Sequence, residues 1–263
     1  MGVRAPHPPD WAAARAVFIT GCDSGLGFSL AHHCLQAGLV VIAGCHTAHS
    51  AAGADSLDRL AGENGRLFVT RHLDVADLTS LTRARATVEQ ALTETNSQLW
   101  AVVNNAAVLV LAKLEWQLDS MMEDQLRVNL LGPLRVARVF LPLLRRNPGS
   151  RIINITSPCA ETRLPLAGLY AASKAGLEAA SDSLRAEEGP VGVLVVLLDP
   201  GDILAHTPLA SRQAEHYAAM ERARAGQEAG PDEETFRRFS QRFSQQLPRP
   251  GLGVIQHSAR LYR

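Results

Sequence analysis

The 263-residue chain has too few cysteines for a disulfide scaffold: there are four, with no C-x-x-C pair and no histidine spacing suited to zinc. It also lacks a charge surplus, because 26 basic residues balance 26 acidic ones, and this neutrality predicts no binding to nucleic acid. No apolar run approaches the ~18 residues of a membrane-spanning helix, and no apolar block typical of a secretory signal is evident. We therefore expect a globular cytoplasmic protein without a metal site, with a mitochondrial or membrane-associated location as the alternative.

Up to about residue 205, the chain alternates short apolar runs with longer helical patterns. Continuous apolar runs are typical of strands that are buried on both faces. The predicted strands are Ala16–Thr20, Leu39–Ala43, Leu67–Thr70, Leu99–Val103, Arg151–Thr156 and Val193–Leu198. The predicted helices are Gly25–Ala37, Ser56–Ala61, Leu78–Thr93, Ser120–Leu144 and Leu169–Glu188. This alternation predicts an α/β fold with a Rossmann-like, doubly wound parallel sheet. Residues 1–206 would form the dinucleotide-binding and catalytic part, and residues 207–263 a short C-terminal helical extension, a lid or tail of the same domain.

A glycine-rich loop follows the first predicted strand directly. It reads Thr20-Gly21-Cys22-Asp23-Ser24-Gly25-Leu26-Gly27, and a helix follows it. Glycines permit a tight turn and let the backbone approach a pyrophosphate at the helix N-terminus. A turn that only packs the helix is the alternative, but the position between strand and helix favours dinucleotide binding.

Tyr170 and Lys174 form a Y-x-x-x-K pair at the start of a predicted helix, where residues four apart share one face. The only other lysine is Lys113, and with three tyrosines in the chain chance predicts roughly 0.02 such pairs. A lysine in a chain that otherwise uses arginine indicates that an ammonium group is needed there. A nearby cation lowers the pKa of a tyrosine, so the pair is suited to proton transfer at an alcohol oxygen.

The T-G-x-x-x-G-x-G loop resembles that of the short-chain dehydrogenases/reductases. Further marks of this family occur in its order: Asp74 after the third strand, Asn104-Asn105-Ala106-Ala107 after the fourth, and Asp199-Pro200-Gly201 after the sixth. The resemblance covers about residues 16–207 and is nearest the branch of D-3-hydroxybutyrate, hydroxysteroid and retinol dehydrogenases. It implies an NAD(P)-dependent oxidoreductase that interconverts a secondary alcohol and a ketone.

The resemblance also implies the residues of a cofactor site. Asp74 would meet the adenine and Asn104 would brace the central strands, while three residues after the sixth strand would border the nicotinamide. The implied cofactor-binding residues are Thr20, Gly21, Ser24, Gly25, Leu26, Gly27, Asp74, Asn104, Ala106, Tyr170, Lys174, Pro200, Gly201 and Thr207.

Four catalytic residues are implied. Tyr170 would be the general acid/base, and Lys174 would tune it while binding the nicotinamide ribose. Ser157, 13 residues before Tyr170, would hydrogen-bond the substrate oxygen, and Asn129 would anchor a water on a proton path to the lysine. For Ser157 and Asn129, a turn-capping serine and a satisfied core asparagine are the alternatives.

The end of the second strand bears on the choice of cofactor. Residues 44–47 contain neither the acid typical of NAD sites nor an arginine, and Ser24 stands where related NADP enzymes often carry a basic residue. Without a cation for the 2′-phosphate, NAD is favoured over NADP. One departure from the family is Ala107, because a glycine usually stands there; if the position requires a positive φ, alanine costs of order 1 kcal/mol.

The substrate is open between two chemistries. Leu164, Leu166, Leu169 and Leu209 would form an apolar wall for a steroid or retinoid, whereas Arg163, His206 and Arg212 would hold the carboxylate of a short hydroxy acid. The rival function is a catalytically weak, nucleotide-binding regulatory protein that keeps the fold; the intact tetrad argues against it, and Ala107 and the short tail argue for it.

The tail after Pro231 predicts one amphipathic helix, with a stripe of Phe236, Phe239, Phe243 and Leu247. A family member would normally end with a seventh parallel strand. Residues 253–259 look more like the start of a helix, so that we expect the strand to be absent and the edge strand Val193–Leu198 to be exposed. The stripe would cover this edge, recruit a partner, or join the basic tail in peripheral contact with a membrane. An exposed edge also makes a regular homo-oligomer doubtful.

Overall fold

The computed structural model describes residues 12, 14–46, 57, 61, 65–201, 203–204, 207–224, 231–246 and 260–261. Its centre is a sheet in the order β3-β2-β1-β4-β5-β6-β7, and β1 to β6 are all parallel. These six strands are β1 (Arg15–Thr20), β2 (Val40–Gly44), β3 (Leu67–Thr70), β4 (Gln98–Asn104), β5 (Arg151–Ile155) and β6 (Leu194–Asp199). The predicted Rossmann-like sheet is confirmed, and each predicted strand end lies within one residue of the observed one.

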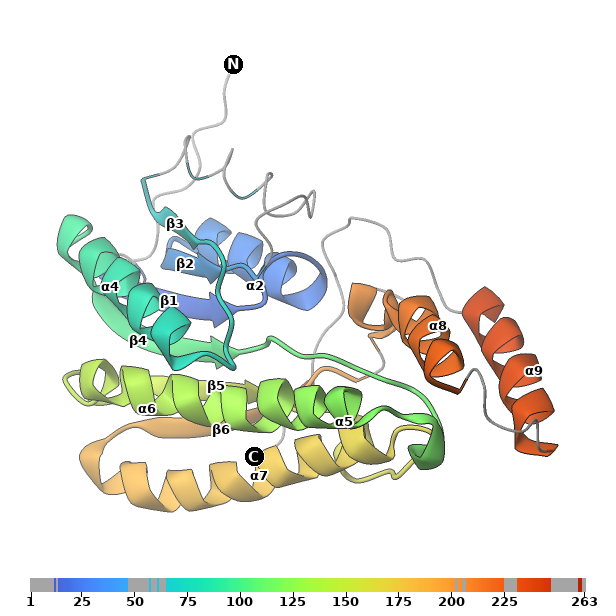
Figure 1. The fold of residues 1–263 in the computed structure, drawn as a ribbon. Helices are drawn as coiled ribbons and strands as arrows, with labels where there is room; N and C mark the ends of the chain where they lie inside the picture. The colour runs from blue at the N-terminus through green and yellow to red at the C-terminus, as the bar shows by residue number, and fades with distance from the viewer. Residues whose placement is uncertain are drawn as a thin grey trace.

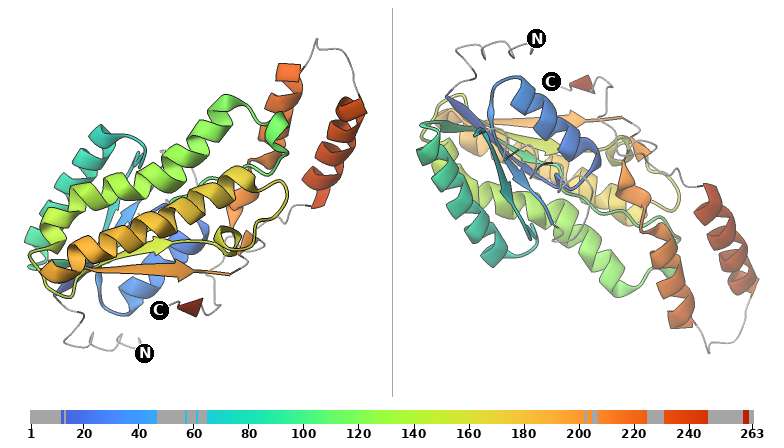
Figure 2. Two further views of the ribbon diagram at one scale, coloured as in Figure 1. Left: turned by 90° about the horizontal axis from the view of Figure 1, so that it is seen from below. Right: turned by 90° about the horizontal axis from the view of Figure 1, so that it is seen from above.

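Apolar residues cover both faces of the sheet, because successive side chains of a strand point to opposite sides. Ala16 and Phe18 lie on the face packed by α4 and α6, whereas Val17 and Ile19 lie on the face packed by α2. Figures 1 and 2 show α4, α6 and α7 on one face of the sheet and α2 on the other. The helices are α2 (Gly25–Gln36), α4 (Leu78–Glu94), α5 (Asp119–Leu126), α6 (Gly132–Leu144) and α7 (Gly168–Glu188).

One helix prediction differs from the structure, and another is largely untested. The pattern over Ser120–Leu144 predicts one helix, but a π-helical turn at Arg127–Leu131 separates α5 from α6. Such turns are common at functional sites, and this one carries Asn129. The predicted helix Ser56–Ala61 lies largely outside the described residues, of which 57 and 61 are helical.

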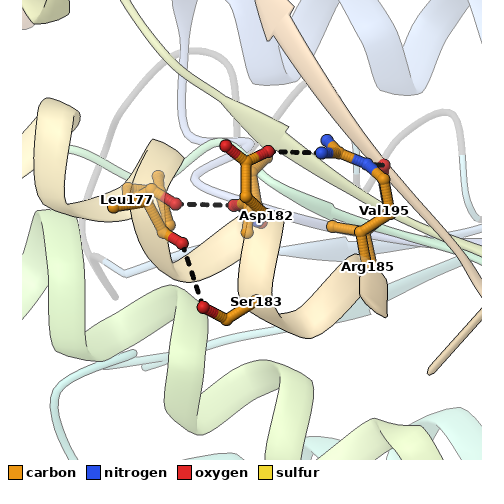
Figure 3. A network of polar contacts seen from close by, with 8 residues as sticks. Leu177, Asp182, Ser183, Arg185 and Val195 are labelled. Carbon is orange, nitrogen blue, oxygen red and sulfur yellow. Dashed lines mark hydrogen bonds and ion pairs between the residues drawn. The ribbon is translucent and has the colours of Figure 1, made fainter. Parts of the chain in front are cut away.

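The prediction that the sixth strand is left exposed is wrong, because two parts of its outer edge have partners. A short strand β7 (Arg260–Leu261) pairs antiparallel with Leu198 and Asp199, so the carboxyl end of β6 has a partner on its outer side. Arg185 of α7 donates from Nε to the carbonyl of Val195 at 2.9 Å and forms an ion pair with Asp182 (Figure 3). A covered end and a charged neighbour both protect an edge strand. The described residues contain no seventh parallel strand, and residues 253–259 lie outside them.

The C-terminal part consists of α8 (Gln213–Arg224) and α9 (Pro231–Gln246), which extend beyond the carboxyl ends of the strands (Figure 1). The predicted amphipathic helix is confirmed, but its described phenylalanines do not cover β6. Phe236 is fully buried and contacts the rings of Trp116 and Tyr217, with centroid distances of 5.1 and 6.3 Å. Phe239 packs against the same two rings. This aromatic cluster fixes α9 to α8, and the Phe243 side chain and Leu247 lie outside the described residues. Within the described residues, no helix is both long and apolar enough to cross a membrane.

Candidate active site

The glycine loop forms a tightly closed cradle at the carboxyl end of β1. Gly21 has a φ of +72°, and a Cβ there would lie 2.8 Å from the Cα of Ala106. At Gly27 a Cβ would lie 2.1 Å from the carbonyl oxygen of Gly21, so the first turn of α2 passes directly over the loop. The first N–H groups of a helix have no partner within that helix. At the start of α2 they are therefore available to bind an anion next to the loop.

Thr20 and Asn105 lock this loop to the end of β4. The Thr20 hydroxyl accepts hydrogen bonds from the backbone N–H groups of Asn105 and Ala106, both at 3.1 Å. The Asn105 amide donates in return to the carbonyls of Thr20 and Gly21, at 2.9 and 3.0 Å. Thr20 and Ala106, both predicted as cofactor residues, therefore hold the shape of the loop. The sequence analysis assigned no role to Asn105, although it stands between Asn104 and Ala106 in the family motif.

Thr207 lies across the loop from Gly25, although 182 positions separate them in the sequence. A Cβ on Gly25 would lie 3.1 Å from both Cβ and Cγ2 of Thr207. The Thr207 side chain is buried, and its hydroxyl oxygen has no hydrogen-bond partner within the described residues. An unpaired buried hydroxyl costs free energy, which a polar group of a bound molecule would recover. The structure thus brings the two predicted edges of the cofactor site together and leaves a polar group between them.

The other predicted cofactor residues are placed as follows. The Asp74 carboxylate accepts from the backbone N–H of Ala76 at 2.8 Å, which fixes the turn after β3. Asn104 donates to Asn154 at 2.7 Å and bridges β4 and β5, while its buried carbonyl oxygen has no partner. Ser24 begins α2 without making a side-chain cap, and Leu26 packs into the core. Gly201, which follows Pro200, has a φ of +73° and donates its N–H to Asp199 at 2.8 Å.

Three predicted catalytic residues meet beside this cradle. Ser157 follows β5, and its hydroxyl is close enough to Tyr170, in the first turn of α7, to lower the pKa of the phenol. Lys174, one turn later, points its ammonium group at the carbonyl of Ile155, with an Nζ–O distance of 2.8 Å. The same Nζ lies 5.8 Å from the centre of the Tyr170 ring. The end of β5 and the first two turns of α7 therefore place a hydroxyl, a phenol and an ammonium group together.

Burial dominates the protonation of this group in the cofactor-free chain, and the lowering of the Tyr170 pKa by Lys174 and a bound nicotinamide stays a prediction. Burial raises the pKa of Tyr170 to about 12, against the lowering effect of the Ser157 hydroxyl, and Cys159 and Asp199 raise it further. Burial also lowers the pKa of Lys174 to about 8, opposed by Glu178. Both shifts have the same physical reason, because a low-dielectric environment disfavours the charged form of either group. In the cofactor-free protein, Tyr170 therefore carries its proton.

Asn129 is completely buried in the π-helical turn, and its side chain is fully engaged. Its amide accepts from the N–H of Val108 at 2.9 Å and donates to the carbonyl of the same residue at 2.8 Å. It also donates to Ser173, whose hydroxyl donates to the carbonyl of Tyr170 at 2.7 Å. These bonds connect Asn129 to the catalytic helix, and the water-mediated path to Lys174 stays a prediction.

Asp23 is a residue that the sequence analysis missed. Its carboxylate accepts a hydrogen bond from the backbone N–H of His46 at 3.0 Å, just beyond the end of β2. The carboxylate is also near enough to Cys45 to raise the pKa of that thiol, after the larger effect of burial. An acid is therefore present at the end of β2, supplied by the glycine loop instead of by β2 itself. No spacing rule along β2 finds it.

Apolar side chains pack around Tyr170. Leu109, Tyr170 and Ala210 form one buried cluster, with four further side chains packed on it: Leu111, Cys159, Leu204 and Leu209. Of the four leucines predicted to form this wall, only Leu209 takes part. Leu164 is 53% exposed, and neither Leu166 nor Leu169 belongs to the cluster.

Two of the three residues predicted to bind a carboxylate substrate, Arg163 and Arg212, contact other groups of the protein instead. Arg163 is exposed and donates to the carbonyl of Glu161, and Arg212 pairs with Glu215 at 3.0 Å on the surface. His206 lies outside the described residues.

Two further predictions concern Ala107, which departs from the family motif, and the absence of a metal site. Ala107 has a negative φ, so the cost considered for alanine at this position does not arise. Among the described residues, no group of three or more histidine, cysteine or acidic side chains is placed to hold a metal ion.

A parallel sheet with a glycine cradle, and with Ser157, Tyr170 and Lys174 at its carboxyl edge, is typical of the short-chain dehydrogenase family. In agreement, residues 15–218 match the short chain dehydrogenase family, and the chain belongs to this family.

Individual relatives agree with the branch expected from the motifs. The chain is 38% identical to mitochondrial D-beta-hydroxybutyrate dehydrogenase of Mus musculus, over 77% of this chain and 58% of that protein. It is 40% identical to retinol dehydrogenase 5 of Homo sapiens, over 70% of this chain and 55% of that protein. The chain thus spans little more than half the length of these relatives. A solved short chain dehydrogenase/reductase from Burkholderia phymatum, in complex with NAD, has the same fold, with a TM-score of 0.70, 22% identity, and coverage of 92% of this chain and 83% of that one.

Proposed function

We propose that the protein is an NAD-dependent oxidoreductase that interconverts a secondary alcohol and a ketone. The observation that carries this proposal is the meeting of Ser157, Tyr170 and Lys174 beside the glycine cradle. The residues fit a dinucleotide, because the loop leaves no room for side chains at Gly21 or Gly27 and the buried hydroxyl of Thr207 lacks a partner. In this proposal, all the predicted cofactor residues border the cofactor site. Thr20 and Ala106 contribute by holding the shape of the loop.

The protein's own side chains handle the proton. When bound, the nicotinamide ring supplies the hydride acceptor for the alcohol, or the hydride donor for the ketone. Ser157 holds the substrate oxygen beside the Tyr170 hydroxyl, which gives its proton to a ketone or takes one from an alcohol. Since the pKa of Tyr170 is about 12 without cofactor, alcohol oxidation needs a positive charge nearby to favour the phenolate. Lys174 supplies one such charge whenever its ammonium group is protonated.

The choice of NAD over NADP is supported by Asp23. Its carboxylate is fixed at the end of β2, where dinucleotide folds of this type place the acid that recognises the ribose 2′-hydroxyl. A negative charge there disfavours the 2′-phosphate of NADP by like-charge repulsion. Arg71 is also close enough to Cys45 to lower the pKa of that thiol, so a cation lies near the same region. In this proposal, the opposite charges of Asp23 and Arg71 decide between NAD and NADP.

The substrate is proposed to be lipophilic, a steroid or retinoid in preference to a short hydroxy acid. The buried apolar cluster around Tyr170 favours this, and the described arginines that would hold a carboxylate are directed elsewhere. α8 acts as a lid in this proposal, because Gln213 and Tyr217 bind the backbone of Leu111, whose side chain packs by Tyr170. D-beta-hydroxybutyrate, the substrate named for the mouse relative, is the alternative.

The test is to incubate the purified protein with NAD and a panel of steroids, retinol and D-3-hydroxybutyrate, and to follow NADH by its absorbance. We expect turnover on a lipophilic secondary alcohol. Binding of NADH without turnover on any substrate would instead support the rival, a catalytically weak nucleotide-binding regulatory protein. Ala107 no longer favours that rival, since its backbone is unstrained. The expected doubt about a homo-oligomer, peripheral membrane contact, a cytoplasmic or mitochondrial location and the absence of nucleic-acid binding stay predictions.

A further inference from the structure

A polar cleft lies at the end of the sheet opposite the candidate active site. It has a volume of about 360 Å³ and is lined by residues that include Arg15, Gln98, Trp100, Arg146, Asn147 and Arg151. Arg15 begins β1, Arg151 begins β5, and Arg146 follows α6, so the cleft is at the amino ends of the strands. Ser157, at the other end of β5, is roughly 20 Å away at ~3.3 Å per residue. The cleft is therefore distinct from the cofactor site.

The guanidinium groups gather around one indole ring. The Cζ atom of Arg151 lies 4.0 Å from the centre of the Trp100 ring, and that of Arg15 lies 5.1 Å from it. The ring holds both cations close together, by attraction to its face and by packing. Burial and the neighbouring Arg15 both lower the pKa of Arg151, because both disfavour the charged form of its guanidinium group.

Arg146 and Arg151 have no carboxylate partner among the described residues. None of the residues that line the cleft is acidic, and neither Arg146 nor Arg151 forms an ion pair there. Arg151 donates from one Nη to the carbonyl of Gly149 at 3.0 Å, but its buried Nε has no hydrogen-bond partner. An unsatisfied buried N–H beside other guanidinium groups is the arrangement that an oxyanion completes.

We propose that this cleft binds a small anion that carries phosphate groups. Arginine presents planar, forked N–H donors that match the oxygens of a phosphate, and the cleft assembles such forks from three separate parts of the chain. A diphosphate group fits better than a single phosphate, because it offers separate sets of oxygens to Arg146 and Arg151.

Calorimetric titration of inorganic pyrophosphate, and separately of inorganic phosphate, into the NAD-saturated protein tests the proposal. Saturation with NAD fills the cofactor cradle, so that binding there does not contribute. We expect one pyrophosphate per chain. Arg146→Gln and Arg151→Lys should each weaken this binding about tenfold or more, since each removes hydrogen bonds to a charged group. The control is Arg83→Gln, which removes one exposed charge from α4 and should change the affinity less than about twofold.

The outcomes separate cleanly. Stronger binding of pyrophosphate than of phosphate assigns a diphosphate ligand, and equal binding assigns a single phosphate group. Absence of saturable binding up to about 10 mM, or an equal loss in Arg83→Gln, would overturn the proposal. Binding that disappears as NAD is added would place the anion in the cofactor cradle and overturn it as well. Because Arg146 is exposed, Arg146→Gln is expected to fold, and it decides the question if Arg151→Lys does not.

Discussion

The substitution Gly27→Ala tests how closely the first turn of α2 approaches the glycine loop. The added methyl carbon would lie 2.1 Å from the carbonyl oxygen of Gly21, 2.8 Å from its carbonyl carbon and 2.5 Å from the Asn105 amide nitrogen. Two of these atoms are backbone, so no side-chain rotation relieves the overlap. Overpacking of this kind costs typically 1–3 kcal/mol, and with a rigid backbone we expect about 3 kcal/mol. For a chain of this size about 2–4 °C of Tm correspond to 1 kcal/mol, which gives a Tm lower by about 6–12 °C.

Gly189→Ala is the matched control, because Gly189 has helical φ and ψ values of −53° and −45° and a Cβ there meets nothing within 4 Å. This substitution should change the free energy of unfolding by less than about 1 kcal/mol, because the restriction of the unfolded chain is offset by the Cβ of a helical residue that precedes Pro190. Thermal unfolding followed by circular dichroism gives both values, and quenching of protein fluorescence by NADH reports the cofactor affinity. A Gly27→Ala protein with unchanged Tm and unchanged NADH affinity would refute the close approach of loop and helix.

Three further predictions concern charge. Asp23→Asn should lower the NAD-to-NADP ratio of kcat/KM about tenfold and raise the NAD-to-NADP ratio of Kd by a similar factor, since one charge beside the ribose is removed; an unchanged ratio in both would exclude Asp23 as the selective residue. Arg145→Gln should lower the Tm more than Glu188→Gln does, because Glu188 is 4% exposed and would keep a buried charge without its partner at 2.5 Å, and the reverse order would contradict this. Lys174 has a lowered pKa in the folded state, so the unfolded chain binds the extra proton between pH 8 and 10.5 and stability rises with pH in that window. The wild-type protein should therefore gain Tm relative to Lys174→Met from pH 8 to 10, and parallel curves would show that the shift is absent.

Much of the fold was predictable, because a sheet covered on both faces requires continuous apolar strands and these are visible as runs such as Val17–Ile19. The π-helical turn was not, because one extra residue in a helix leaves the apolar periodicity almost unchanged. The short β7 was missed for a related reason: two residues carry no strand signal. Its pairing with β6 depends only on where the chain end lies.

In the candidate site, the residues that share one short segment were predictable and those joined across the fold were not. The Tyr170–Lys174 spacing states by itself that the two side chains share a helical face. The contact between Gly25 and Thr207, and that between Asp23 and His46, depend on how distant loops meet. The raised pKa of Tyr170 in the cofactor-free chain was not predictable either, because the extent of burial exists only in the folded chain.

The measurement that tests the central claim most directly is the turnover of Tyr170→Phe on the alcohol that the wild-type protein oxidises, together with its NADH affinity. The account predicts a kcat lower by about 10²–10⁴-fold, the usual contribution of an acid–base group, since only the hydroxyl handles the proton. The Kd for NADH should stay within about twofold of the wild-type value, because the ring remains in place. A variant that keeps more than about a tenth of the wild-type kcat would contradict the assignment of Tyr170 as the general acid/base.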